Sequence, residues 1–159
     1  MAGERGPAAS LDAQCNKQAI YAYFDSKEGL WDAVLNAIVA DIVETVPIDA
    51  FDLPGYAISL FDRYQDHPET LRLITWYQLE GKTLPEVAVA STSHKIEAIR
   101  RAQEAGAVSR RFSPEVILML VINLTRLGAP DSVEASCGMV QADVFRRTIA
   151  DAVVRLVGP

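Results

Sequence analysis

The sequence predicts an all-α protein. Apolar residues recur at steps of three and four along most of the chain, which is the spacing of one face of an α-helix. No stretch of any length alternates apolar and polar residues as a half-buried β-strand does. Prolines and glycines separate the apolar stretches at positions typical of helix starts and helix ends. With 159 residues, of which 50% are hydrophobic, the chain can bury one substantial core.

The first long helix is expected over residues 26–46. Two adjacent rows of apolar residues form a wide stripe along its predicted surface, which indicates a helix of the core. The rows consist of Trp31, Leu35, Val39 and Val43, and of Leu30, Val34, Ile38, Ile42 and Val46. Asp25 lies three residues before Glu28, the spacing of a capping box, and Ser26 could equally cap the helix.

Three further helices follow a break at residues 47–54. Pro54 and Pro68 occur where first-turn prolines are favoured, and they predict helices over residues 53–65 and 68–80. Pro85 opens the next helix. That helix is expected to end at Gly106, because glycine readily adopts the left-handed conformation found after helix C-termini.

Two more helices complete the predicted fold. Ser113, Pro114 and Glu115 supply a cap, a first-turn proline and an acid at the positive end of the helix dipole. The helix that they begin runs to about Leu127 and is apolar on nearly all sides, so it must be covered on more than one. A last helix is expected over about residues 138–156. We therefore predict a homodimer built from these two helices. The predicted interface residues are Leu118, Val121, Ile122, Phe145, Ile149 and Val153.

The charge distribution limits where nucleic acid could bind. The formal net charge of −6 disfavours a protein that coats nucleic acid with its whole surface. Charges balance up to Lys27, whereas residues 28–62 contain seven acids and no base. We therefore expect any DNA contact to be confined to the N-terminal segment.

The composition disfavours several other classes of protein. The longest apolar run, residues 116–122, is far shorter than the roughly 20 residues that span a bilayer, and residues 1–13 lack the features of a signal peptide. Cys15 and Cys137 lack metal-ligand spacing, so neither a disulfide nor a metal site is predicted. No nucleophile has a plausible base. We predict a cytoplasmic protein that does not associate with membranes, is not an enzyme and needs no cofactor.

The most specific motif is residues 16–35, NKQAIYAYFDSKEGLWDAVL. A short polar and aromatic helix passes there through a tight turn into the long amphipathic helix. The aromatic group at residues 20–24, Asp25 and the Ser-Lys-Glu of residues 26–28 closely resemble the end of the DNA-binding domain of TetR-type transcriptional repressors. Further on, residues 67–80 resemble the sixth helix of that family.

The resemblance implies a small helix-turn-helix DNA-binding head over residues 1–27 and a larger helical ligand-binding and dimerisation bundle over residues 28–159. A helix that enters the major groove needs small or polar side chains toward the bases and donors toward the phosphates. By position in the motif, the DNA-binding residues are Asn16, Lys17, Gln18, Tyr21, Tyr23 and Lys27. As an alternative, the aromatic residues at 21–24 would form only a packing cluster.

The segment before Cys15 departs from the family pattern. Residues 2–6 resemble the tail of the first helix and residues 10–13 the start of the second, but the third helix begins several residues too early. Either the helix-turn-helix carries a deletion or residues are missing from the sequence. We favour missing residues, because a deletion inside a helix-turn-helix would destroy it.

Aromatic residues gather where the ligand pocket of such a bundle would lie. In addition, Asn123 and Arg126 follow an apolar run, and such groups, when buried, must find partners within the protein or on a ligand. The predicted ligand-binding residues are Phe61, Tyr64, Trp76, Tyr77, Met119, Asn123 and Arg126. They indicate a largely apolar small-molecule effector whose charge stays open. Core packing and a structural hydrogen-bond network are the alternative roles of these residues.

These features together predict a homodimeric, ligand-responsive transcriptional regulator. We expect a repressor that binds a palindromic operator in double-stranded DNA and is released by a small-molecule effector. The alternative is a helical dimeric module that binds a ligand or a protein and has no DNA-binding activity. The incomplete first 15 residues are the feature that favours this alternative.

Overall fold

The computed structural model describes residues 26–81, 85–129, 137–138 and 141–158, and these residues form α-helices and no β-strand. The helices are α2 (Lys27–Thr45), α3 (Leu53–Asp66), α4 (Pro68–Leu79), α5 (Glu86–Glu104), α6 (Pro114–Thr125) and α8 (Ala142–Val157). The all-α prediction is confirmed. Most predicted helix bounds agree with the structure to within two residues, and the last helix begins at Ala142 rather than near residue 138.

Local hydrogen bonds fix where the helices begin. The Ser26 hydroxyl accepts a hydrogen bond from the backbone N–H of Gly29 at 3.0 Å, so Ser26 caps α2. The carboxylate of Asp52 caps α3 by accepting from Gly55 N–H at 2.9 Å. Ser113 caps α6, as predicted. Each cap satisfies one of the N–H groups that the first turn of a helix leaves without an intrahelical partner.

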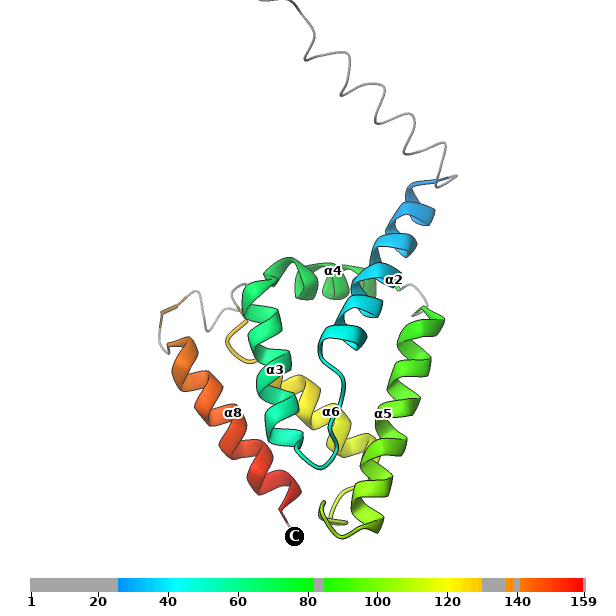
Figure 1. The fold of residues 1–159 in the computed structure, drawn as a ribbon. Coiled ribbons are helices and arrows are strands. Elements are labelled where there is room, and N and C mark those ends of the chain that lie inside the picture. The colour runs from blue at the N-terminus through cyan, green and yellow to red at the C-terminus, as the bar shows by residue number, and fades with distance from the viewer. Residues whose placement is uncertain (1–25, 82–84, 130–136, 139–140, 159) are drawn as a thin grey trace, which may run out of the picture.

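Helix α3 lies at the centre of the bundle (Figure 1). It packs against α8, α6 and α4, while α5 packs against α6 and α2. Helix α2 packs against α4 and α5, and its N-terminal end extends beyond the rest of the bundle (Figure 1). The N-terminal end of the described chain therefore lies at the edge of the bundle.

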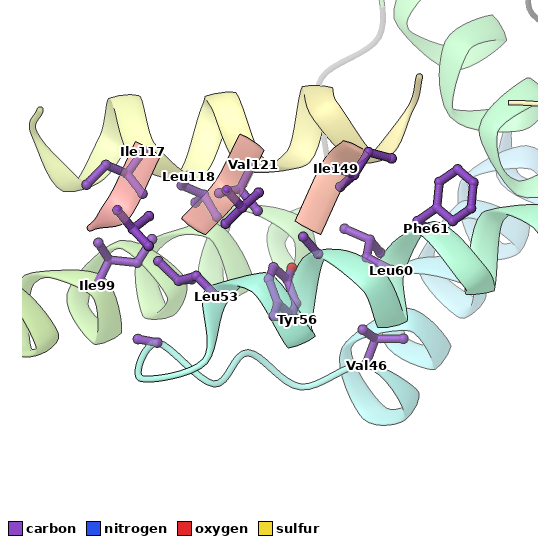
Figure 2. Close-up of a cluster of buried hydrophobic side chains, with 14 of the residues drawn as sticks. Val46, Leu53, Tyr56, Leu60, Phe61, Ile99, Ile117, Leu118, Val121 and Ile149 are labelled. Carbon is purple, nitrogen blue, oxygen red and sulfur yellow. The ribbon is translucent and has the colours of Figure 1, made fainter. Parts of the chain in front are cut away.

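The core is formed by side chains from α3, α5, α6 and α8 (Figure 2). The largest fully buried side chains are Phe61, Leu53, Ile99, Ile117, Ile149, Val121, Val153 and Thr125. Their helical spacing places one face of each helix toward the bundle centre. The wide apolar stripe of α2 contributes Leu35, Ile42 and Val46 to the buried residues.

Four of the six residues predicted for a dimer interface belong to the interior of a single chain. Leu118, Val121, Ile149 and Val153 each expose 3% or less of their surface. Such side chains have no accessible surface left to present to a second chain. The sequence pattern did not separate the inner from the outer face of α6, because α6 is apolar on nearly every side. A dimer built on α6 and α8 stays a prediction, and it must use other side chains of these helices.

A hydrogen-bonded turn joins α5 to α6. Gly106 adopts a φ of 77°, as expected for the residue that ends a helix. The buried amide of Gln103 donates to the carbonyl oxygens of Ser109 at 2.7 Å and Phe112 at 2.9 Å. The N–H of Ser109 donates to the carbonyl of Val157 at 2.9 Å, so the turn also holds the end of α8.

We expect Gly128→Ala to destabilise the fold more than Gly106→Ala. Both glycines have positive φ, 69° and 77°, which costs an alanine about 1–2 kcal/mol. A Cβ on Gly128 would also lie 2.4 Å from Phe145 Cδ2, whereas a Cβ on Gly106 would meet open space. Overpacking adds about 1–3 kcal/mol to the loss. Urea unfolding of both variants measures the difference, and equal losses would contradict the packing of Phe145 on Gly128.

Candidate ligand-binding cavity

A cavity of about 170 Å³ lies where α2, α3, α4, α5 and α6 meet. Its wall is mostly apolar, with a few polar groups that converge on the same space. The lining residues are Leu35, Val39, Ile42, Val43, Tyr64, Ile74, Tyr77, Gln78, Ala88, Ser91, Thr92, Lys95, Ile122 and Arg126. An apolar cavity with a small number of placed polar groups is the usual composition of a small-molecule site.

The sequence predicted three of these lining residues as ligand-binding residues. Tyr64 comes from α3, Tyr77 from α4, and Arg126 from the C-terminal end of α6, and the fold brings them to one cavity. Burial raises the pKa of the Tyr64 hydroxyl, which the charge of Arg126 partly opposes. Tyr64 therefore remains a neutral hydrogen-bonding group at physiological pH.

The other four predicted ligand-binding residues lie elsewhere. Phe61 is in the core. Trp76 is not among the residues that line the cavity and instead stacks on Trp31 of α2, with ring centroids 4.6 Å apart. Met119 and Asn123 are exposed on α6, where the Asn123 amide donates to the backbone carbonyl of Met119 at 2.8 Å. Both residues lie on the side of α6 that faces away from the cavity. A run of apolar residues does not reveal which side of a helix faces inward.

Lys95 is the main residue that sequence reasoning missed. Its ammonium lies 5.8 Å from the centre of the Tyr56 ring, and burial lowers the pKa of its side chain. The signal that could have found it is helical spacing. Lys95 lies four residues before the fully buried Ile99 and seven after Ala88, so it shares the inward face of α5.

Helix α2 is both a wall of the cavity and the link to the N-terminal segment. Its middle supplies four of the lining residues, from Leu35 to Val43. Its early turns contact α4 through the Trp31–Trp76 pair and through the Tyr77 hydroxyl, which donates to the Asp32 carboxylate at 3.3 Å. Tyr77 therefore touches the cavity and α2 at once, so movement of this side chain can be passed to α2.

The predicted DNA-binding residues lie almost entirely outside the described part of the chain. Asn16, Lys17, Gln18, Tyr21 and Tyr23 all precede the first described residue. The sixth, at position 27, is the first residue of α2. Their assignment therefore stays a prediction from the motif.

Comparison with known proteins identifies the family. Residues 52–155, more than half of the chain, match the profile of the tetracyclin repressor-like C-terminal domain. The chain belongs to the TetR family of transcriptional regulators. It is 35% identical over 126 residues to the HTH-type transcriptional repressor SCO4008 of Streptomyces coelicolor, and this alignment covers 76% of the chain and 66% of that relative.

A solved structure shows the same fold. SCO4942 of Streptomyces coelicolor, a protein classed as a transcriptional regulator, superposes with a TM-score of 0.79 at 31% sequence identity. The match covers 89% of this chain and 80% of that one. The TetR-like architecture inferred from the sequence is thereby confirmed. The profile match begins at residue 52, so α2 and the motif before it precede the matched domain.

Within the described part of this TetR-family chain, one apolar face of α6 is uncovered. The exposed apolar side chains recur on one side of the helix and its C-terminal turn, namely Val116, Met119, Leu120 and Leu127. Helix α8, which packs against α6, exposes Val144 and Val154. These side chains have the accessible surface that the buried residues predicted for a dimer interface lack.

The described ranges contain no candidate for a membrane span or for a metal site. Within these ranges no helix is both long and apolar enough to cross a bilayer. In the same part of the chain, no group of three or more His, Cys, Asp or Glu side chains could hold a metal ion. Cys137 is an exposed free thiol.

Proposed function

We propose that this TetR-family protein is a homodimeric repressor. Its N-terminal segment binds a palindromic operator in double-stranded DNA, and a small molecule in the cavity releases the operator. The similarity to SCO4008, a transcriptional repressor, supports this role. The observation that carries the proposal is the position of α2, which begins directly after the predicted DNA-binding segment and ends as a wall of the cavity.

The response to an effector follows from this position. A ligand among Leu35, Val39 and Tyr77 pushes on α2 or on the Tyr77–Asp32 hydrogen bond. Because the N-terminal end of α2 extends beyond the bundle, a small tilt of α2 at the cavity becomes a larger shift at residue 27. The effector needs only a higher affinity for the shifted arrangement to move the population toward it.

A dimer makes this shift decisive for DNA binding. Two recognition helices reach adjacent major grooves only when they are spaced by about one helical turn, roughly 34–36 Å. Moving both α2 helices changes that spacing, so the two halves no longer engage the operator together. The uncovered apolar face of α6 and the exposed Val144 and Val154 of α8 support association through these helices.

Selection from a random pool of DNA duplexes tests the proposal. The expected result is enrichment of inverted repeats with two equal half-sites. Absence of any enriched sequence would contradict the repressor role and would favour a helical module that binds a ligand or a protein. A single half-site without a repeat would contradict the dimer.

We expect Lys27→Ala to weaken operator binding without unfolding the protein. Lys27 opens α2, where the positive end of the helix dipole and the ammonium together favour a phosphate. Loss of one phosphate contact should reduce affinity similarly for all sequences and lower the slope of log affinity against log salt by about one. Fluorescence anisotropy at several salt concentrations measures the slope.

The matched control is Arg101→Ala, which removes an exposed cation from α5. It should leave the salt slope unchanged. Gln18→Ala should instead alter the preferred sequence, because this residue is predicted to meet base edges. An unchanged slope for Lys27→Ala would show that the inferred docking is wrong.

A further inference from the structure

The cavity carries positive charge without a matching acid. Of the residues that line it, Lys95 and Arg126 are cations, and none is an aspartate or glutamate. The two cations come from different helices, since Lys95 is on α5 and Arg126 ends α6. The sequence did not determine the charge of the effector, whereas the lining of the folded cavity favours a negative charge.

Neither cation is neutralised within the described part of the chain. Among these residues, Lys95 forms no hydrogen bond or ion pair, and its contact is with the face of Tyr56. The Nε atom of Arg126 is buried and has no hydrogen-bond partner among the same residues. Burial of an unpaired cation costs free energy, which an anion bound in the cavity would recover.

The nearby acids of α2 are engaged outside the cavity. Asp41 pairs with Arg63 of α3, and Asp32 accepts the hydrogen bond of the Tyr77 hydroxyl. Glu44 is exposed to solvent. None of the seven acids at residues 28–62 lines the cavity, so the lining offers no carboxylate to a cationic effector.

The size of the cavity limits the body of the ligand. An apolar cavity of about 150 Å³ holds one benzene molecule. The volume here is about 170 Å³, and the wall around it is aliphatic, with Leu35, Val39 and Ile42 on α2. A single ring or a short hydrocarbon chain matches this space.

A second hollow adjoins the cavity. It is a groove of about 350 Å³ between the end of α2 and α5, and it shares Val43, Ser91 and Lys95 with the cavity. Lys95 therefore lies in the wall between the two hollows. A ligand somewhat longer than one ring has apolar space beyond Lys95.

We propose that the effector of this protein is a compact organic anion, a carboxylate on a single ring or short hydrocarbon body, whose charge pairs with Lys95 and Arg126. This proposal rests on the proposed function, because it takes the cavity to be the effector site. The anion would replace missing partners of both cations with charge-assisted hydrogen bonds, while its apolar body contacts the α2 wall.

Isothermal titration calorimetry with ligands of equal shape and different charge tests the proposal. Benzoate, benzamide and benzamidine share one ring and are anionic, neutral and cationic at neutral pH. Octanoate and octanamide repeat the comparison with a linear body. In at least one series the carboxylate should bind about tenfold or more tightly than the neutral amide, the effect of one charge-assisted hydrogen bond.

Substitutions of the two cations then test whether they bind the carboxylate of the ligand. Lys95→Met and Arg126→Met should each reduce carboxylate affinity to near that of the amide, while Lys95→Arg should keep most of it. Lys95→Met should fold, because it removes a partly buried charge and keeps the length of the side chain. Arg101→Met, an exposed cation on the same helix as Lys95, is the matched control and should change neither affinity.

Equal or weaker binding of both carboxylates relative to their amides overturns the proposal, as does preferential binding of benzamidine. DNA binding by the ligand-free protein is measured separately. If a neutral or cationic compound releases DNA through the cavity, the anion proposal fails and the repressor role stands. If the carboxylate binds through Lys95 and Arg126 but the protein selects no DNA sequence, the repressor role fails and the anion site stands.

Discussion

Met119→Glu is expected to convert the proposed dimer into a folded monomer. Met119 is 64% exposed at the middle of the uncovered apolar face of α6, so the substitution leaves the core intact. In a two-fold interface the new carboxylates would lie near one another in an apolar setting, and such like-charge contacts cost several kcal/mol. Dimer affinity should fall by about a hundredfold or more. Light scattering at micromolar concentration, with circular dichroism to verify folding, measures this change.

Operator binding should fall with the dimer. Two linked half-sites gain about 10²- to 10⁴-fold in affinity over one, and a monomer loses that gain. Val89→Glu provides the control, because Val89 is an exposed apolar residue of α5 on neither α6 nor α8. This variant should stay dimeric and bind DNA normally. If Met119→Glu also stayed dimeric, the interface would have to lie on another surface.

Phe61→Ala is expected to destabilise the fold by about 3–5 kcal/mol, because it leaves a cavity at the centre of the bundle. Phe61 lies on α3, exposes 1% of its surface and packs in the main core (Figure 2). Phe51→Ala removes the same side chain at a position that is 67% exposed, just before α3, and should change stability by no more than about 0.5 kcal/mol. Urea unfolding measures both.

Both variants must be compared at one protein concentration, because the proposed dimer would add to the apparent stability. A loss below about 1 kcal/mol for Phe61→Ala would contradict its place in the core. It would reopen the role that the sequence suggested for this residue, which was contact with the ligand. The same experiment thus separates the structural from the ligand-binding interpretation of Phe61.

The helices themselves were predictable because their signals are local. Ser113 caps α6 through an N–H three residues away, and Gly106 ends α5 through its own backbone conformation. Such interactions depend on a few neighbouring residues, so the sequence determined them almost alone. The cap of α2 was the exception, since Asp25 and Ser26 were both suitable, and the structure places Ser26 there.

The candidate site was predictable only in part. The sequence placed Tyr64 and Tyr77 in a ligand site because aromatic residues gather in that region, and Arg126 because a buried polar group in an apolar bundle must find a partner. All three line the cavity. By itself the sequence also determined the family resemblance. The motif at residues 16–35 consists of adjacent residues, so it can be recognised without knowledge of the fold.

Only the tertiary structure decided which face of each helix is turned toward the core or the cavity. Trp76 and Met119 have the composition of ligand-contacting residues, but helix rotation turns one toward Trp31 and the other toward solvent. The cavity gains its second cation, Lys95, because α5 packs against α2. The physical reason is that helix formation depends on contacts three or four residues apart, whereas the lining of a cavity depends on how separate helices pack together.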